Sequence, residues 1–138
     1  MELAKLRHIV VEGPIGVGKT TLARRLSEKL RADLLLEAPE QNPFLEKFYR
    51  DSRRYALQTQ LFFLFQRIEQ LRDLAQADLF ARPVVSDFLL EKDPLFAQLT
   101  LNDDELGLYQ KIYSSLSPQA ATPDLVIFLM ASPDTLIE

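Results

Sequence analysis

Residues Gly13 to Thr20 read Gly-Pro-Ile-Gly-Val-Gly-Lys-Thr, which matches the phosphate-binding loop pattern G-x-x-x-x-G-K-[ST] in full. The β-branched run from His8 to Val11 precedes the loop and predicts a strand, and the leucines spaced four residues apart from Thr21 to Leu30 predict a helix. The motif requires this order, because loop amides and the start of a helix bind phosphate together. A chance glycine turn would not place strand, loop, lysine and helix in this register. We therefore predict a site for a nucleoside triphosphate.

The loop residues have distinct expected roles toward ATP and its metal ion. Lys19 would reach the β- and γ-phosphates, and the Thr20 hydroxyl would hold Mg²⁺. Backbone amides of the loop would turn inward around the phosphates. The expected ATP-binding residues are Gly13, Pro14, Ile15, Gly16, Val17, Gly18, Lys19, Thr20 and Thr21.

Composition narrows the class of protein. The chain has 138 residues, 47% of them apolar, no cysteine and a net charge of −4, which predicts one domain over residues 1–138. No run of basic residues exceeds two, so a nucleic-acid partner is not expected. No window approaches the roughly 18 apolar residues of a membrane span. The absence of cysteine fits a reducing compartment, and we expect a cytoplasmic protein.

Strand-like runs alternate with helical patterns along the chain. The runs are Arg7–Glu12, Asp33–Glu37, Pro83–Asp87 and Asp124–Met130. This alternation predicts an α/β fold of the three-layer α/β/α P-loop nucleoside triphosphate hydrolase type, with a mainly parallel sheet. The last run is continuously apolar, as expected for a strand that is covered on both faces.

The end of the sequence suggests a longer protein. Ser132 and Pro133 carry the N-cap and first-turn signals of a helix, but the sequence stops about one turn later, at Glu138. We expect residues 1–138 to be the N-terminal part of a longer chain.

A long helix is predicted from about Arg53 to Phe80. Gln60 and Arg67 lie on the edge of its apolar stripe and need polar partners, which either the fold or a ligand would supply. Phe62 projects from the opposite side, where an exposed aromatic ring suggests a partner surface. The stripe residues are Leu57, Leu61, Leu64, Ile68, Leu71 and Ala75.

Taken together, these residues resemble the deoxynucleoside kinase family, in particular its bacterial deoxyadenosine/deoxyguanosine kinase branch. The resemblance spans essentially the whole chain, and its combination of segments is more specific than the phosphate loop alone. The segments are residues 12–23, Glu37, residues 42–49, Gln60, Arg67, residues 85–88, residues 95–97 and residues 123–129.

The resemblance implies a role for several side chains outside the loop. Glu37 would be the general base that takes the proton from the sugar 5′-hydroxyl, and its place at the end of a parallel strand is where α/β sheets bind ligands. Glu40 is the alternative base. Tyr49 would bind the sugar 3′-hydroxyl.

The long helix would then recognise the base. Gln60 would read the base edge with its paired donor and acceptor, and Arg67 would support the base and the carboxylates around it. Gln58 is the alternative to Gln60. The resemblance also implies a homodimer through helix 53–80. It further implies that a C-terminal strand and a lid over the triphosphate are missing from residues 1–138.

A carboxylate is expected on Mg²⁺ after the third strand. Asp87 ends that strand beside the phosphate loop, where such a carboxylate usually lies. The best-known family members carry Glu-Arg-Ser at this point, whereas this chain carries Asp-Phe-Leu. Lys92 is a candidate replacement for the missing arginine, and its alternative is a solvated surface lysine.

The predicted reaction is transfer of the ATP γ-phosphoryl group to the 5′-hydroxyl of a deoxynucleoside. A nucleoside monophosphate kinase of the thymidylate type is the nearest alternative, but it needs arginines facing the acceptor phosphate, and Phe88 stands there instead. The other alternative is a nucleotide-binding or dimerisation module without turnover. The identity of the base does not follow from the sequence.

Overall fold

The computed structural model describes residues 6–13, 18–76 and 82–130. Contacts along the chain define two compact units. The sheet unit comprises Met1–Glu37, Asp78–Leu89 and Thr122–Glu138, and the helical unit comprises Ala38–Ala77 and Leu90–Ala121. Neither unit is a continuous segment, because each contains parts of the chain that are distant in sequence.

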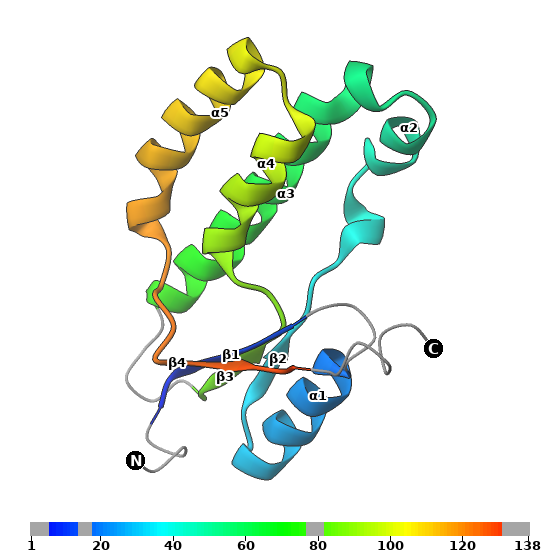
Figure 1. Cartoon of the computed structure of the whole chain (residues 1–138). Coiled ribbons are helices and arrows are strands. Elements are labelled where there is room, and N and C mark those ends of the chain that lie inside the picture. Colours follow the sequence, from blue (N-terminus) through cyan, green and yellow to red (C-terminus); the bar gives the residue numbers. More distant parts are fainter. Residues whose placement is uncertain (1–5, 14–17, 77–81, 131–138) are drawn as a thin grey trace. The chain divides into compact units, whose positions relative to one another are not determined.

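The sheet unit contains a parallel sheet with the strand order β2-β3-β1-β4 (Figure 1). Its strands are β1 (His8–Glu12), β2 (Asp33–Leu35), β3 (Val84–Ser86) and β4 (Leu125–Phe128). All three pairings are parallel. The four predicted strands are confirmed, although each is shorter than predicted. In this order the carboxyl ends of β2, β3 and β1 follow one another along one edge of the sheet.

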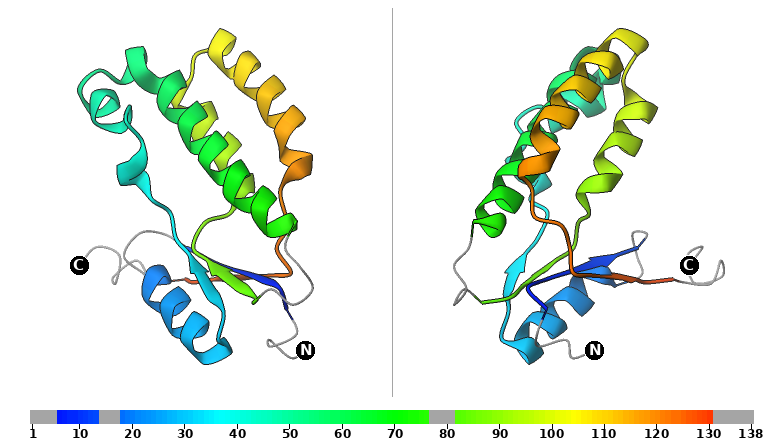
Figure 2. Two further views of the ribbon diagram at one scale, coloured as in Figure 1. Left: turned by 180° about the vertical axis from the view of Figure 1, so that it is seen from behind. Right: turned by 90° about the vertical axis from the view of Figure 1, so that its left-hand side faces the viewer.

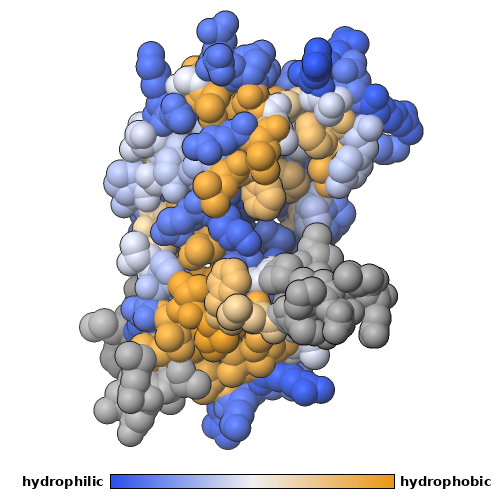
Figure 3. Space-filling view, viewed as in Figure 1, coloured by the Kyte–Doolittle hydropathy of each residue, from blue (hydrophilic) through white to orange (hydrophobic). Residues whose placement is uncertain are grey.

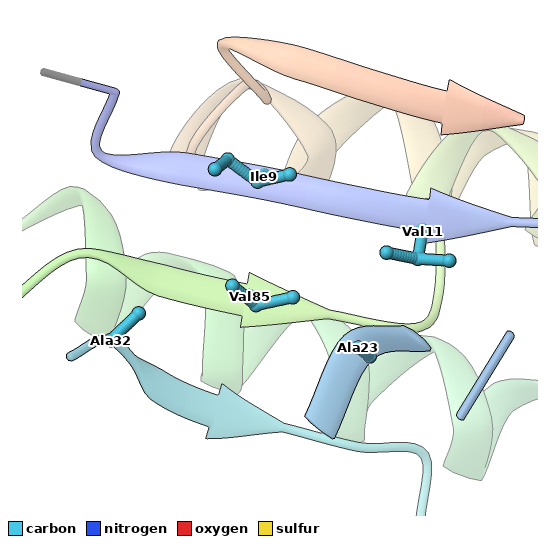
Figure 4. Close-up of a cluster of buried hydrophobic side chains, with 5 residues drawn as sticks. All are labelled: Ile9, Val11, Ala23, Ala32 and Val85. Carbon is cyan, nitrogen blue, oxygen red and sulfur yellow. The ribbon is translucent and has the colours of Figure 1, made fainter. Parts of the chain in front are cut away.

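The core of the sheet unit lies between the sheet and α1 (Lys19–Leu30). Residues on one face of β1 alternate with those on the other, so Ile9 and Val11 both point toward the helix. Half-buried leucines of α1, at the predicted four-residue spacing, pack against this cluster. The buried members, shown in Figure 4, are Ile9, Val11, Ala23, Ala32 and Val85.

Strand β4 differs from the prediction that it is covered on both faces. Leu125 and Ile127 pack against the core of the sheet unit, whereas Val126 and Phe128 are exposed. Successive side chains of a strand point to opposite faces, and in β4 only those of Leu125 and Ile127 lie on the face of the core cluster. Continuous apolar sequence did not distinguish these two faces.

The helical unit is built around α3 (Ser52–Ala75), which packs against α2 (Leu45–Arg50), α4 (Asp93–Thr100) and α5 (Asp103–Leu116) (Figure 2). The short turns η2 (Pro39–Gln41), η3 (Leu90–Lys92) and η4 (Ser117–Gln119) complete it. The long helix is therefore confirmed, but it ends at Ala75, with Gln76 as its C-cap, before the predicted end at Phe80, which lies outside the described residues. None of the described helices is long and apolar enough to cross a membrane.

The buried stripe of α3 follows the prediction only in its second half. Leu64, Ile68 and Leu71 are buried, but Leu57 and Leu61 are only half-buried and Ala75 is exposed. In the first half the buried residues are Ala56, Thr59 and Gln60. Two hydrogen bonds hold this side of the helix against its neighbours. Asn42 donates to the Thr59 carbonyl (3.0 Å), and Gln60 donates to Asp93 (3.2 Å).

The prediction that Phe62 is exposed is wrong. Phe62 is half-buried in α3, which packs against α2, α4 and α5. The exposed aromatic residue of α3 is Phe65, which is 49% exposed. Figure 3 shows further apolar side chains on the surface over α4, where Leu95, Phe96 and Leu99 are exposed.

Helix α5 (Asp103–Leu116) is capped at its start by Asn102. The Asn102 side chain accepts a hydrogen bond from the Glu105 amide (2.9 Å), and the Glu105 carboxylate accepts one from the Asn102 amide (3.1 Å). This reciprocal capping box satisfies two backbone donors at the start of the helix.

Candidate active site

The phosphate-binding loop joins β1 to α1. Gly13 and Gly18 border it, and Gly18 has a φ of 83°, in the left-handed region that L side chains rarely adopt. Gly18 is also the N-cap of α1, and its carbonyl accepts from the Leu22 amide (3.0 Å). The helix therefore starts at the loop, where its free amides favour an anion. The predicted ligands Pro14, Ile15, Gly16 and Val17 lie outside the described residues.

Lys19 lies beside a carboxylate that the sequence reasoning did not single out. The ammonium nitrogen of Lys19 is 3.5 Å from Oε1 of Glu12, and the same oxygen accepts from the Gly13 amide (2.9 Å). Glu12 is buried at the end of β1. Its signal in the sequence was an acid directly after a β-branched strand, immediately before the loop. Glu12 thus brings together the two ends of the phosphate-binding loop.

Two predicted site residues, Thr20 and Glu37, form hydrogen bonds with a third, Asp87. Oδ2 of Asp87 accepts from the Thr20 hydroxyl (3.3 Å), and Oδ1 accepts from the Glu37 amide (2.9 Å). The Asp87 amide in turn donates to the Leu35 carbonyl (3.4 Å). These contacts arise because β2 and β3 are parallel neighbours, so their carboxyl ends reach the same edge of the sheet, next to the start of α1.

Glu37 and its alternative differ in their surroundings. Hydrogen bonding of the Glu37 amide to Asp87 anchors the backbone, while Glu37 itself remains exposed, two residues after β2. Glu40 is exposed in η2, within the helical unit. Thr21, the last predicted loop ligand, is exposed in the first turn of α1.

A second polar cluster lies inside the helical unit, around Asp93. Asp93 is fully buried at the start of α4. Nε2 of Gln60 donates to Oδ2 of Asp93 (3.2 Å) and to its backbone carbonyl (3.3 Å), and Arg67 forms an ion pair with Oδ1. The Tyr109 hydroxyl donates to Oδ2. The partner that Gln60 and Arg67 need is therefore supplied by the fold.

Asp93 and Tyr109 were missed in the sequence. An Asp followed by Pro94 is an ordinary helix start, which leaves no sign of a buried carboxylate. Burial raises the pKa of Tyr109, and its hydrogen bond to Asp93 raises this pKa further, so the phenol remains protonated and acts as the donor. Burial also raises the pKa of Tyr113, whose ring stacks on Tyr109 with centroids 6.1 Å apart.

The orientation of the Gln60 amide follows from its neighbours. Both atoms that face Nε2 are acceptors, so the nitrogen, and not the oxygen, points at Asp93. The amide oxygen accepts no hydrogen bond from the described residues. Gln58, the alternative to Gln60, is exposed.

Two further predicted residues, Tyr49 and Lys92, also lie in the helical unit. Tyr49 on α2 is 75% exposed, and its ring centroid lies 6.0 Å from that of Phe48. Lys92 is half-buried at the end of η3, directly before Asp93 in the chain.

A glycine-bounded loop between a parallel strand and a helix, with lysine and threonine at the helix start and a carboxylate after the neighbouring strand, defines a P-loop nucleotide-binding protein. The chain belongs to the deoxynucleoside kinase family: the family profile described as "Deoxynucleoside kinase" matches residues 9–138.

Two curated relatives support this assignment. The chain is 40% identical over 130 residues to deoxyguanosine kinase of Bacillus subtilis (strain 168), a match that covers 94% of this chain and 63% of the relative. It is 34% identical over 136 residues to deoxyadenosine kinase of Dictyostelium discoideum, with 95% and 54% covered. The chain thus spans less than two thirds of the length of either relative.

A solved structure agrees with the fold. Deoxyadenosine kinase from M. mycoides, with the products dCMP and dCDP bound, matches with a TM-score of 0.77 and 26% identity, over 94% of this chain and 67% of that chain. The predicted P-loop kinase type of α/β fold is confirmed.

Proposed function

We propose that the full-length protein is a cytoplasmic deoxynucleoside kinase that transfers the γ-phosphoryl group of ATP to the 5′-hydroxyl of a deoxynucleoside. Membership of the family supports this reaction. The observation that carries it is the contact set around Asp87, which joins Thr20 to the anchored backbone of Glu37. Phosphoryl transfer depends on positioning and charge neutralisation, and these residues suit both tasks.

The negative charge of the ATP phosphates is neutralised by groups at the start of α1 and by the metal ion that Asp87 would hold. Lys19 and the loop amides bind the phosphates of ATP. Thr20 and Asp87 would hold Mg²⁺, which would supply positive charge to neutralise the phosphates of ATP. Their hydroxyl and carboxylate oxygens fit a hard cation, and one or two protein ligands suffice for Mg²⁺ beside a nucleotide. Among the described residues, no group of three or more His, Cys, Asp or Glu side chains is placed so that it could hold a metal ion.

Glu37 activates the acceptor. A neutral 5′-hydroxyl is a weak nucleophile, and a carboxylate within hydrogen-bonding reach removes its proton as the bond to phosphorus forms. The exposure of Glu37 leaves it accessible to substrate, and the bond from its amide to Asp87 anchors its backbone. Asp87 would therefore both bind the metal ion and position the general base, Glu37.

The helical unit orients the nucleoside. Gln60 and Arg67 contact the base, Tyr49 binds the 3′-hydroxyl, and Lys92 supplies positive charge in place of the arginine found in the best-known members. The relatives named as deoxyguanosine and deoxyadenosine kinases favour a purine base.

The enzyme acts as a homodimer through α3, the long helix Ser52–Ala75. Phe65 lies half exposed on α3, where a partner helix could contact its ring. Light scattering of the full-length protein tests this, with Phe65→Glu expected to shift the mass from dimer to monomer. A monomeric wild type contradicts the dimer without affecting the proposed reaction.

The reaction is tested with the full-length protein, ATP, Mg²⁺, the four deoxynucleosides and the four corresponding monophosphates. We expect deoxynucleosides to be converted to monophosphates with release of ADP. Phosphorylation of the monophosphates alone would instead identify a monophosphate kinase. ATP binding with no phosphorylated product from any acceptor would identify a binding module.

A further inference from the structure

Tyr109 is a buried titratable residue that the proposed mechanism does not use. It lies on α5 with no exposed surface, and its hydroxyl donates to Oδ2 of Asp93. A phenol that is buried this completely needs a partner. Here the partner is the same carboxylate that binds Gln60 and Arg67.

Three donors from two helices hold the carboxylate of Asp93 in place. Arg67 on α3 occupies Oδ1, while Gln60 on α3 and Tyr109 on α5 share Oδ2. A carboxylate oxygen has two lone pairs, so these two donors fill Oδ2. Removal of the Tyr109 hydroxyl frees one buried lone pair and lets the carboxylate plane turn.

The orientation of the Gln60 amide depends on this carboxylate. Its two amide protons are directed at Oδ2 and at the Asp93 carbonyl, so its oxygen is left to accept a hydrogen bond from a ligand. A base must then present an N–H group to Gln60. A carboxylate that turns weakens this preference, because the amide can rotate and offer its nitrogen instead.

We propose that Tyr109 is a positioning residue for nucleoside recognition: by holding Asp93, it keeps the Gln60 amide oxygen turned toward an N–H group of the base. Tyr109 acts through Asp93 and touches no substrate. This inference rests on the proposed deoxynucleoside kinase function and extends it to residues of α5.

Tyr109→Phe in the full-length enzyme tests the proposal. The change keeps the ring and its stacking on Tyr113 but removes the donor. We expect the KM of the preferred deoxynucleoside to rise about tenfold, as for the loss of a hydrogen bond to a charged group, with kcat and the KM of ATP unchanged. The preference for that deoxynucleoside over its analogue without the exocyclic amine should fall by a similar factor.

Tyr113→Phe is the matched control, because it removes a hydroxyl from the stacked neighbour, which makes no described hydrogen bond to Asp93. It should change the nucleoside KM by less than about twofold. A double-mutant cycle supplies the second measurement: in a Gln60→Ala background, Tyr109→Phe should have no further effect on the KM of the nucleoside.

The outcomes separate the two proposals. An active wild type whose folded Tyr109→Phe variant keeps its nucleoside KM and its preference overturns the positioning role alone. Equal losses toward nucleoside and ATP, or additive losses in the double variant, overturn it as well, since they indicate general damage. A wild type that phosphorylates no deoxynucleoside refutes the proposed function itself.

Discussion

Removal of the Asp93 side chain should strongly destabilise the protein. Asp93 is 0% exposed and its ion-pair partner Arg67 is only 14% exposed, so Asp93→Ala removes a buried carboxylate from a nearly buried guanidinium. Gln60 and Tyr109 lose an acceptor at the same time. Breaking a buried ion pair from one side typically costs about 3–5 kcal/mol. Because the lost hydrogen bonds belong to the same network, they do not add in full, and we expect a loss of about 4 kcal/mol.

The assay is urea unfolding at neutral pH, followed by circular dichroism, for wild type and variants. Glu46→Ala is the control, because it breaks the Glu46–Arg50 ion pair, whose side chains are 80% and 79% exposed. Such a pair within one helix contributes less than about 0.5 kcal/mol. Asp93→Asn, which keeps the shape and one acceptor, should fall between the two. If the free energy of unfolding of Asp93→Ala lies within about 1 kcal/mol of the wild-type value, the network does not hold the helical unit together.

Three further outcomes are expected. Lys19→Ala should strongly weaken ATP binding in calorimetry while the protein stays folded, and unchanged affinity would contradict the phosphate-loop reading. Glu37→Gln should lower kcat by about 10²–10⁴-fold with little effect on nucleoside binding; if Glu40→Gln abolishes turnover instead, Glu40 is the base. The pKa of Tyr109 is raised above its ordinary value of about 10, so the phenol loses its proton in the unfolded chain at a lower pH than in the folded protein. The protonated phenol therefore stabilises the folded protein fully below about pH 10, and this stabilisation declines at higher pH. The free energy of unfolding should therefore fall more steeply from about pH 10 to 11 in wild type than in Tyr109→Phe, by up to about 1.4 kcal/mol per pH unit, and equal slopes would contradict the raised pKa.

The phosphate-loop region and the strands follow from local sequence. The pattern from Gly13 to Thr20 marks the loop because glycine and lysine positions there meet local demands of backbone and charge. The β-branched and apolar runs predicted all four described strands, since side-chain periodicity reflects burial within a few residues. The placement of Thr20, Glu37 and Asp87 near one another was also predictable, because the carboxyl ends of neighbouring parallel strands share an edge.

Tertiary structure alone decided how the polar residues of the helical unit are paired. Gln60 and Arg67 were recognisable as polar residues beside an apolar stripe, but either a ligand or the fold could have satisfied them. Asp93, 33 residues beyond Gln60, does so, and Tyr109 joins it from another helix. No local pattern distinguishes an acid at a helix start that faces solvent from one that is buried. Whether the acid is buried depends on which helices pack against the helix start. Because burying a charge without partners is costly, a buried acid there must be paired with particular donors from those helices.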